Sequence, residues 1–454
     1  MSSSSASTML TTPIKVGRME LLHRIVLAPL TRSRSKLNTL TQTPIHAEYY
    51  RQRASKGGLL ISEATFISPE TVGFQRSPGI FTAEQVESWK QVTQAVHEKG
   101  GYIYCQLWHI GRVAHPSFAA HALVKAQAVP TPPGVSASDV PTGLPAVTYD
   151  GQTVDGAVPR ALETKEIPRL IDDYRHAARC AIEAGFDGVE LHGAHGYLID
   201  QFLNDGVNKR TDQYGGSLEN RARLLLEVID ALIAELGADR VACRLSPHNN
   251  DTYSYNGVKD SNPDAIYGYA IKELSKRKLA YLLLTEPRWD PKFKGDAVTD
   301  PGHQLPSVNA DKFRSLYEGV LIGAGGYTPL SGLQALELGK YDLIGFGRWF
   351  ISNPDIVTRI QYRQPLNIYR RETFYIWKSP EPEGIDEGYT DYPTFDQVLR
   401  QIGYSEEEVK DLSSRVLSDE EAEQIVARSH DKGLKYPLIT QVRLGNSTSA
   451  GSRL

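Results

Sequence analysis

The stretch Gly188–Leu236, GVELHGAHGYLIDQFLNDGVNKRTDQYGGSLENRARLLLEVIDALIAEL, contains the repeating unit that decides the fold. It begins with a short apolar run at Gly188–His192 and continues through a polar, glycine-rich segment. It ends in Leu218–Leu236, where leucines and other apolar residues recur at the spacing of an amphipathic helix. A short apolar strand followed by a helix is typical of a parallel sheet whose faces are covered by helices.

Apolar runs of this kind recur between residues 20 and 350. Helix-like stretches occur at Thr82–Lys99 and Ile167–Ala184 as well as at Leu218–Leu236. Strand–helix units in this series predict an α/β fold, a single (β/α)8 TIM barrel. The alternative is an open, doubly wound sheet, but that fold usually has G-x-G-x-x-G after its first strand, and the sequence has no such motif there. The predicted strands are Ile25–Leu30, Leu59–Glu63, Tyr102–Leu107, Gly188–His192, Val241–Leu245, Ala280–Thr285, Gly319–Gly323 and Tyr341–Phe346.

One segment interrupts the repeat after the third strand. Residues 114–160 are rich in Pro, Gly, Ala and Ser, and they contain an Asp-Gly hairpin signal at Tyr149–Gln152. A long loop or hairpin insertion at this point would lie over the C-terminal mouth of the barrel. Long loops there commonly act as lids or specificity elements.

The two ends of the chain differ from the barrel. We expect residues 1–12 to be a disordered tail, residues 13–404 to form the barrel, and residues 405–454 to form a helical extension with a flexible end. Capping boxes that begin at Ser405 and Ser418 predict two surface helices in the extension. The chain ends in Ser452–Leu454, a conservative variant of the S-K-L peroxisomal signal, which predicts a peroxisomal import receptor as partner. The alternative is a coincidental ending on a cytoplasmic protein.

The composition narrows the class of protein. The 50 Lys and Arg against 54 Asp and Glu give a formal net charge of −4, which argues against a nucleic-acid binder held by bulk charge. No apolar run approaches the roughly 18–20 residues of a membrane span. The three cysteines form no CxxC motif, so we expect neither a disulfide framework nor an iron–sulfur cluster built on that motif. Cys105 and Cys243 are one residue out of phase with the side chains that face the site, so a core position is expected for both.

Glycines after the seventh and eighth strands predict a phosphate site. Gly325, Gly326 and Gly347 would let backbone N–H groups approach a phosphate, and Arg348 could pair with it. Tight barrel turns are the alternative reason for these glycines. Because barrels commonly place phosphate at the ends of strands seven and eight, we expect a phosphate-bearing ligand.

Two histidines and a tyrosine follow the fourth strand. His192 and His195 are three residues apart, and Tyr197 follows. If the chain turns there from strand to helix, both imidazoles can donate to a carbonyl or phenolate oxygen, and Tyr197 could protonate a neighbouring carbon. A metal site is the alternative, since H-x-x-H can chelate a metal and Glu63 or Glu286 could add a ligand.

Side chains at three other strand ends do not suit a cation site. Arg244, Gln106 and Thr31 would rather form hydrogen bonds with a flat heterocycle that is rich in acceptors. An arginine in a barrel mouth is costly unless it meets an anion, and a reduced flavin has negative charge near N1. The alternative is an ion pair between Arg244 and a barrel carboxylate.

These strand ends resemble those of the Old Yellow Enzyme family of flavin-dependent ene-reductases. The resemblance rests on Val189–Leu224 and on shorter motifs, and it runs from about residue 12 to about residue 403. It is nearest to the fungal members and to the plant members that are similar to oxophytodienoate reductases. The shorter motifs include IVLAPLTRSR (Ile25–Arg34), YCQLWHIGR (Tyr104–Arg112), CRLSP (Cys243–Pro247), GAGGYTP (Gly323–Pro329) and GFGRWFISNPD (Gly345–Asp355).

The resemblance implies a tightly bound FMN across the barrel mouth, reduced by NADPH as the hydride donor. It also implies which residues hold the FMN. The residues that would contact its ring are Pro29, Thr31, Ala64, Gln106 and Arg244, and those that would hold its phosphate are Gly325, Gly326, Gly347 and Arg348.

The same resemblance implies the substrate site. His192 and His195 would bind the carbonyl oxygen of an α,β-unsaturated ketone or aldehyde, hydride from FMN N5 would attack its β-carbon, and Tyr197 would protonate its α-carbon. Phe74 lies where Tyr is common in the family, a difference expected to affect substrate preference. The residues that would shape the pocket are Trp108, Phe74 and Tyr375.

Three other functions stay open at this point. A flavin-dependent isomerase would move a double bond without net reduction, although Tyr197 favours reduction. A metal-dependent barrel hydrolase would use His192 and His195, and a binding module would recruit a partner through the tail helices. We expect a monomer or homodimer with no nucleic-acid or membrane partner.

Overall fold

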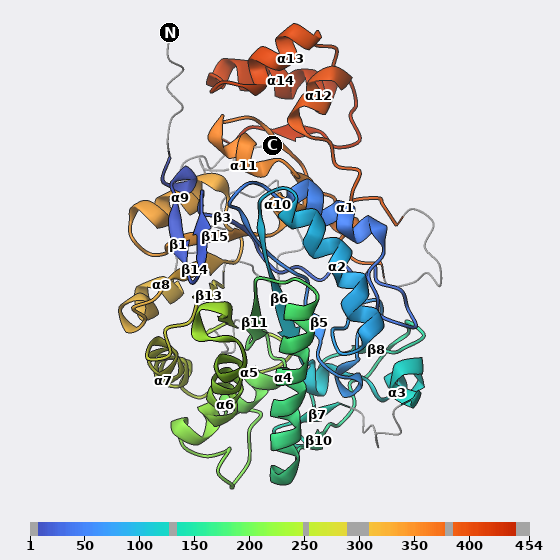
Figure 1. Ribbon diagram of the computed structural model, residues 1–454, viewed down its shortest axis with the longest axis vertical. Helices are drawn as coiled ribbons and strands as arrows, with labels where there is room; N and C mark the ends of the chain where they lie inside the picture. Colours follow the sequence, from blue (N-terminus) through green and yellow to red (C-terminus); the bar gives the residue numbers. More distant parts are fainter. Residues whose placement is uncertain (1–7, 127–133, 248–253, 288–307, 377–384, 442–454) are drawn as a thin grey trace.

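The computed structural model describes residues 8–126, 134–247, 254–287, 308–376 and 385–441. Within these ranges, parallel strands form a closed barrel (Figure 1). The strands follow one another in chain order around the barrel, and pairing between β6 and β11 closes it. The predicted (β/α)8 barrel is therefore confirmed, and the open-sheet alternative is wrong. The barrel strands are β3 (Ile25–Leu27), β4 (Leu59–Ile61), β6 (Tyr102–Trp108), β11 (Gly188–His192), β12 (Val241–Leu245), β13 (Tyr281–Thr285), β14 (Leu321–Ala324) and β15 (Leu343–Phe346).

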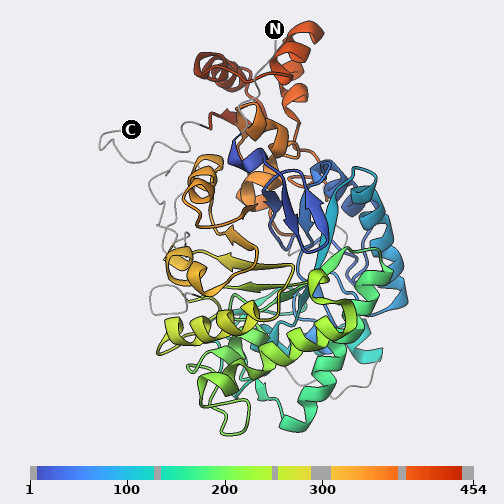
Figure 2. The same ribbon diagram turned by 60° about the vertical axis from the view of Figure 1, so that its left-hand side comes forward.

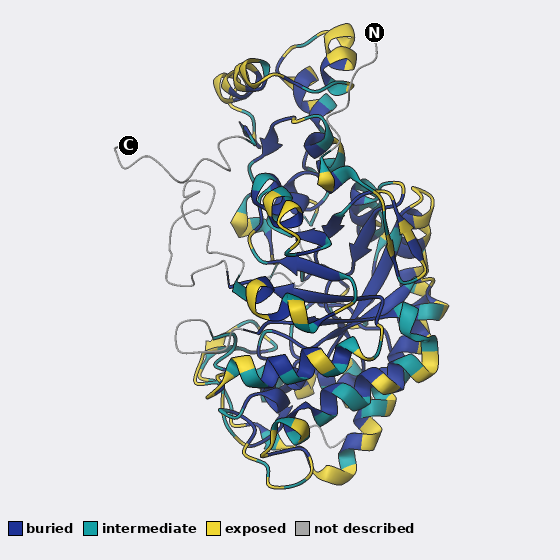
Figure 3. Cartoon of the chain, turned by 90° about the vertical axis from the view of Figure 1, so that its left-hand side faces the viewer, coloured by how far each residue is buried: buried dark blue, intermediate teal, exposed yellow. Residues whose placement is uncertain are grey.

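Helices surround the strands as an outer layer (Figure 2). The outward faces of the longer helices are exposed, whereas the strands and the helix faces that cover them are buried (Figure 3). None of the helices in the described ranges combines the length and the apolar character that crossing a membrane would require. The helices of this layer are α1 (Pro44–Arg53), α2 (Ala83–His97), α4 (Ile167–Glu183), α5 (Leu198–Leu203), α6 (Leu218–Leu236), α7 (Pro263–Ser275), α8 (Val308–Phe313), α9 (Pro329–Glu337), α10 (Arg348–Ser352) and α11 (Ile356–Gln361).

Side chains alternate between the two faces of the barrel wall. Cys243 belongs to the core between the strands and the helices, whereas its neighbour Ala242 belongs to the core inside the barrel. Arg244 has the same parity as Ala242 and so faces inward. Cys105 lies in the outer core like Cys243, which confirms the core position predicted for both.

A hairpin closes the N-terminal end of the barrel. Strands β1 (Ile14–Val16) and β2 (Met19–Leu21) pair antiparallel and contribute apolar side chains to the core inside the barrel. At their turn, a Cβ on Gly17 would lie 2.3 Å from the carbonyl oxygen of Asp239, which precedes β12. The hairpin therefore lies against the N-terminal ends of the strands, opposite the end where barrel enzymes place their sites.

The insertion after β6 forms the predicted hairpin. Strands β8 (Ala146–Val147) and β9 (Thr153–Val154) pair antiparallel, and the N–H of Gly151 donates to the carbonyl of Thr148 over 2.9 Å in the turn between them. Tyr149 packs against a buried hydrophobic cluster that includes Phe66, Trp108 and Phe118. The insertion thus lies at the C-terminal mouth of the barrel, as expected.

The C-terminal extension has a core of its own and lies at one end of the molecule (Figure 1). The two capping boxes predicted at Ser405 and Ser418 begin helices α13 (Glu406–Ser413) and α14 (Asp419–Asp431). The extension starts before the expected boundary at residue 405, because α12 (Phe395–Gln401) packs its apolar side chains against α13 and α14. Strand β17 (Leu438–Ile439) pairs with β16 (Leu366–Asn367) and joins the extension to the barrel.

Part of the segment expected to be an N-terminal tail is folded against the barrel. Met9–Thr11 forms a 3-10 turn against α9, and Leu10 is 1% exposed, so burial of this apolar side chain fixes part of the segment expected to be a tail. Residues 1–7 and 442–454, which include the predicted flexible end and Ser452–Leu454, lie outside the described residues.

Candidate active site

Polar side chains line the inside of the barrel near the C-terminal ends of its strands. Gln106 on β6 and Glu190 on β11 are both buried, and Nε2 of Gln106 donates to Oε1 of Glu190 over 2.7 Å. Burial raises the pKa of Glu190 to about 7, against the opposing effect of the Arg244 charge. The interior is therefore polar and charged at this level of the barrel.

Arg244 lies at the centre of this group, 8% exposed, on the neighbouring strand β12. Its Nε donates to Oγ1 of Thr285 over 3.1 Å, and its Nη1 donates to the carbonyl oxygen of Pro29 over 3.4 Å. Among the described residues Arg244 forms no ion pair, and the charge of Glu190 acts on it at longer range. A buried guanidinium whose hydrogen-bond partners in the described ranges are neutral oxygens favours an electron-rich or anionic group beside it.

His192, the last residue of β11, is held as a neutral donor. Its Nδ1 accepts the backbone N–H of Ala194 over 3.3 Å, which leaves Nε2 to bear the ring proton. Burial, together with the charge of Arg244, holds the pKa of His192 well below its ordinary value. The ring therefore offers an uncharged N–H group.

His195 is fixed at its backbone and at its ring. Its φ is +57°, a conformation uncommon outside glycine. Its N–H donates to Oγ of Ser246 over 2.8 Å, and its carbonyl accepts Nδ2 of Asn256 over 2.8 Å. Its Nε2 lies 3.1 Å from Oγ1 of Thr285, and burial followed by the Arg244 charge keeps its pKa well below the ordinary value.

Tyr197 stands between two other rings of the site. Its ring centroid lies 4.9 Å from that of Trp108 and 5.0 Å from that of His192, with interplanar angles of 83° and 88°. Phe74 stacks on Trp108 with centroids 5.5 Å apart. Burial raises the pKa of Tyr197 against the opposing effect of a hydrogen bond with the side chain of Asn256, and the phenol of Tyr375, which is 45% exposed, also raises it. Tyr197 is therefore a neutral phenol.

The loops after β3 and β4 bring three more of the predicted residues to the mouth. The backbone N–H of Arg32 donates to Oε2 of Glu63 over 3.1 Å, so this bond joins the residue after Thr31 to the residue before Ala64. Ala64 and Pro29 are buried, and Thr31 is partly exposed. The bond from Arg244 to Pro29 connects this side of the mouth to β12.

The four residues predicted to hold a phosphate follow the adjacent strands β14 and β15: Gly325, Gly326, Gly347 and Arg348. Gly325 has φ +109°, and a Cβ there would lie 2.4 Å from the carbonyl oxygen of Glu286, so only glycine fits. Nη1 of Arg348 donates to the hydroxyl of Tyr369 over 2.9 Å. The strand ends thus combine an open backbone with a guanidinium, a donor set that suits a phosphate.

The two glutamates considered as metal ligands have other roles. Glu63 accepts the N–H of Arg32, while Glu286 accepts the backbone N–H groups of Asn309 and Ala310 over 3.0 and 3.2 Å, near the start of α8. Within the described ranges, no three His, Cys, Asp or Glu side chains form a group that could hold a metal ion. Neither glutamate joins the histidines in a metal site.

Comparison with known proteins gives the family. The model for the NADH:flavin oxidoreductase / NADH oxidase family matches residues 9–367, which include every barrel strand and every site residue described above except Tyr375 and Tyr369. The chain belongs to this family. As a member it is a flavin-dependent oxidoreductase, and the family's cofactor is FMN.

Individual members of the family match over most of their length. The putative 12-oxophytodienoate reductase 11 of Oryza sativa is 47% identical over 391 residues, covering 86% of this chain and 98% of the relative. The 12-oxophytodienoate reductase 2 of Arabidopsis thaliana is 44% identical over 392 residues, covering 86% and 96%. The solved structure of the old yellow enzyme homologue from Zymomonas mobilis superposes with a TM-score of 0.74 at 40% identity, covering 85% and 99%. The predicted resemblance to the Old Yellow Enzyme family is confirmed.

The donor set of this family member fits FMN. Arg244 supplies a buried positive charge without an ion-pair partner among the described residues, which suits the electron-rich pyrimidine edge of a flavin. Gln106 lies on the same inner face two residues before Trp108, and its amide can pair with the imide edge of such a ring. Gly325 and Arg348 would hold the phosphate. FMN contains the flavin ring and the phosphate in one molecule.

The site also contains residues that were not predicted from the sequence, among them Glu190, Thr285 and Tyr255. Glu190 has the same parity as His192 on β11, so strand alternation could have placed it inside the barrel. Thr285 ends a predicted strand, a position that could have marked it as a site residue. Tyr255, whose ring centroid lies 4.6 Å from that of His195, comes from the loop after β12 and has no comparable signal.

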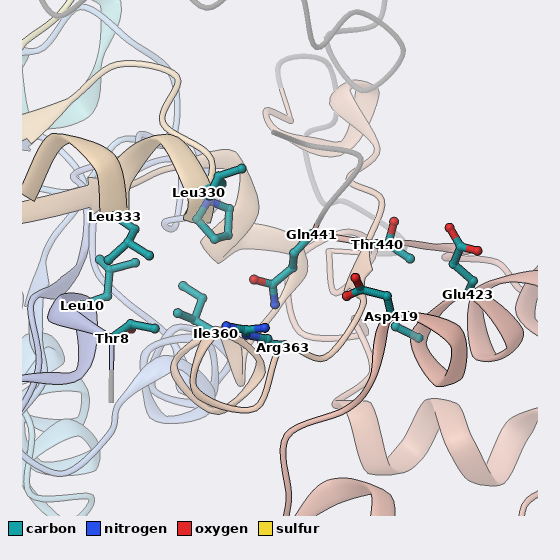
Figure 4. A pocket seen from close by; sticks show the side chains of 12 residues that line it. Thr8, Leu10, Leu330, Leu333, Ile360, Arg363, Asp419, Glu423, Thr440 and Gln441 are labelled. Atoms are coloured by element: carbon teal, nitrogen blue, oxygen red, sulfur yellow. The ribbon is translucent and has the colours of Figure 1, made fainter. Parts of the chain in front are cut away.

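A separate pocket of about 370 Å³ lies between the barrel and the extension (Figure 4). Its walls come from the N-terminal turn, α9, α11, α14 and the segment after β17. Leu10, Leu333 and Ile360 supply apolar surface, and Arg363 and Asp419 supply charged groups. None of its lining residues belongs to the site at the strand ends.

Proposed function

We propose that the protein is an NADPH-dependent, FMN-containing ene-reductase that reduces the activated C=C bond of α,β-unsaturated ketones and aldehydes. The observation that supports this most directly is the arrangement of His192, His195 and Tyr197. Two neutral imidazoles and one neutral phenol converge beside a buried arginine. Neutral N–H donors suit a carbonyl oxygen on which negative charge develops during the reaction.

In this proposal, the N–H groups of His192 and His195 bind the carbonyl oxygen of the substrate. Their donation withdraws electron density and makes the β-carbon electrophilic. FMN, when bound and reduced by NADPH, supplies the hydride that the β-carbon accepts. Tyr197 donates the phenolic proton to the α-carbon, and Trp108 and Phe74 form an aromatic wall of the pocket.

The proton donor Tyr197 favours net reduction over isomerisation of a double bond. An isomerase returns the hydride it removes and leaves the oxidation state of its substrate unchanged. Tyr197 is uncharged at neutral pH and lies against His192, so the site can deliver a proton to carbon as well as bind oxygen. The relatives from rice and Arabidopsis are named as reductases of 12-oxophytodienoate, a name that denotes an oxo group and a dienoate in one molecule. This name agrees with a substrate of the proposed class.

A visible absorption spectrum tests the proposed function first. We expect the purified protein to show a flavin band that bleaches with NADPH under anaerobic conditions and returns on addition of cyclohexenone. Return of the band with saturated product detected by mass would support reduction. A protein that shows no flavin band even after addition of FMN would contradict the proposal.

We also propose peroxisomal import through Ser452–Leu454, which is supported by the similarity of this tripeptide to S-K-L. Deletion of the three residues should convert a punctate distribution of a fluorescent fusion into a diffuse one. The fluorescent protein must be fused at the N-terminus so that the tripeptide stays terminal. An unchanged punctate pattern would contradict the proposal.

A further inference from the structure

Thr285 contacts both halves of the site through one hydroxyl group. It is the last residue of β13 and is 6% exposed. Its Oγ1 lies 3.1 Å from Nε of Arg244 and 3.1 Å from Nε2 of His195. One buried oxygen therefore joins the residue proposed to face the flavin to a residue proposed to bind the substrate.

The chemistry of Arg244, Thr285 and His195 indicates which group donates in each of the two hydrogen bonds. Arg244 has no acceptor on its guanidinium, so its Nε can only donate to Thr285. The hydroxyl then keeps its own proton, and among the described residues His195 Nε2 is the acceptor within reach. Donation from a cation to the hydroxyl oxygen polarises the O–H bond and strengthens its own donation.

The state of His195 agrees with this direction. Burial and the charge of Arg244 keep the ring neutral, so only one of its nitrogens bears a proton. If Nε2 accepts from Thr285, the proton must lie on Nδ1. Ser246 and Asn256 hold the backbone of His195 at its unusual φ, and Thr285 is the described residue within hydrogen-bond distance of its ring.

We propose that Thr285 is a positioning residue that fixes His195 as the Nδ1–H tautomer and couples Arg244 to His195. The two histidines then present complementary nitrogens: Nε2–H on His192, whose Nδ1 accepts from Ala194, and Nδ1–H on His195. The proposal rests on the proposed function for the role of these donors. The tautomer itself is argued from the contacts of Thr285 and from the neutral state of His195.

The decisive experiment reads the tautomer without measuring turnover. The FMN-bound enzyme is labelled with ¹⁵N-histidine, and the ring signals of His195 are assigned by their loss in His195→Gln. We expect the Nε2 signal in the range of an unprotonated nitrogen and the Nδ1 signal in the protonated range. Thr285→Val, which keeps the shape and removes the hydroxyl, should change this pattern, whereas Thr285→Ser should keep it. Thr285→Ala serves if the valine variant does not fold.

Ligand affinity gives a second readout. Titration of p-chlorophenol into the flavin band should show about tenfold weaker binding to Thr285→Val, the size expected for one lost hydrogen bond, and rescue to within about twofold in Thr285→Ser. A parent enzyme with the proton on Nε2 of His195, or a valine variant with unchanged tautomer and affinity, would overturn the proposal. Failure of the proposed function would show instead as a parent protein without enone turnover, while the tautomer signals would still be readable.

Discussion

The rings of His192 and Tyr197 meet edge to face, with centroids 5.0 Å apart and planes at 88°. His192 ends strand β11 and Tyr197 directly precedes α5, so one tight turn of the chain holds both. The turn depends on Gly196, at φ +72°, whose N–H donates to the buried carboxylate of Asp200 over 2.8 Å. The group proposed to bind oxygen and the group proposed to protonate carbon are therefore fixed relative to each other.

Tyr197→Phe should stop reduction of the substrate without stopping reduction of the flavin. The phenyl ring can keep the edge contacts with Trp108 and His192, while the proton donor is lost. Rapid mixing with NADPH should show flavin reduction within about twofold of the parent, and reoxidation by cyclohexenone should slow by about 10²- to 10⁴-fold. Equal reoxidation rates in the variant and the parent would contradict the role of Tyr197.

His192→Ala should weaken binding of phenols and enones while FMN stays bound. The substitution removes one N–H donor, so the affinity for p-chlorophenol should fall by about 10- to 100-fold, as for loss of a hydrogen bond to a charged oxygen. The measurement is a titration followed in the flavin band, with flavin content as the check on cofactor binding. His195→Asn is the matched comparison, because an amide keeps a donor, and it should bind more tightly than His195→Ala. Equal affinity in His192→Ala and the parent would rule out the oxygen-binding role.

The affinity for an uncharged ketone should not change as the pH passes through the ordinary pKa of histidine. An imidazolium is a stronger donor than an imidazole, so a histidine with the ordinary pKa of about 6.5 would increase ketone affinity as the pH falls through that value. Burial and Arg244 hold the pKa values of His192 and His195 well below it. In Glu190→Gln, which removes the carboxyl of the site that titrates near pH 7, the dissociation constant of cyclohexanone should therefore stay within about twofold from pH 8 down to pH 5.5. A transition near pH 6.5 that is absent from His192→Ala would contradict the neutral pair.

The sequence predicts most of the barrel because each strand is a short apolar run whose end is marked by a polar or glycine-rich turn. The same regularity places Gln106, His192 and Arg244 at one end of the molecule, since parallel strands end together. Contacts between side chains of different strands are not specified in this way. The bonds from Gln106 to Glu190 and from Arg244 to Thr285 depend on the stagger and tilt of the strands, which no spacing along the chain reveals.

The boundaries of the barrel also depend on contacts between distant residues, which the local sequence pattern does not predict. Leu10 lies in a Ser/Thr-rich segment that has the composition of a tail, yet it is buried by residues from distant parts of the chain. Phe395 lies before the expected boundary of the extension and belongs to its core. A single apolar residue in a polar segment does not by itself predict that distant residues will bury it.

Glu190→Gln should change how stability depends on pH. Burial raises the pKa of Glu190 to about 7, so between about pH 4.5 and pH 7 the folded protein keeps a proton that the unfolded chain releases. The contribution of this carboxyl to stability is therefore greatest below about pH 4.5 and falls as the pH rises to about 7. Glutamine can still accept from Gln106 but does not titrate.

Between pH 5 and pH 8 the parent should lose up to about 3 kcal/mol more unfolding free energy than the Glu190→Gln variant. Denaturant titrations at the two pH values measure this difference, and Glu87→Gln, at an exposed carboxyl on α2, is the control. Parallel losses in parent and Glu190→Gln would show that Glu190 titrates alike in the folded and unfolded states.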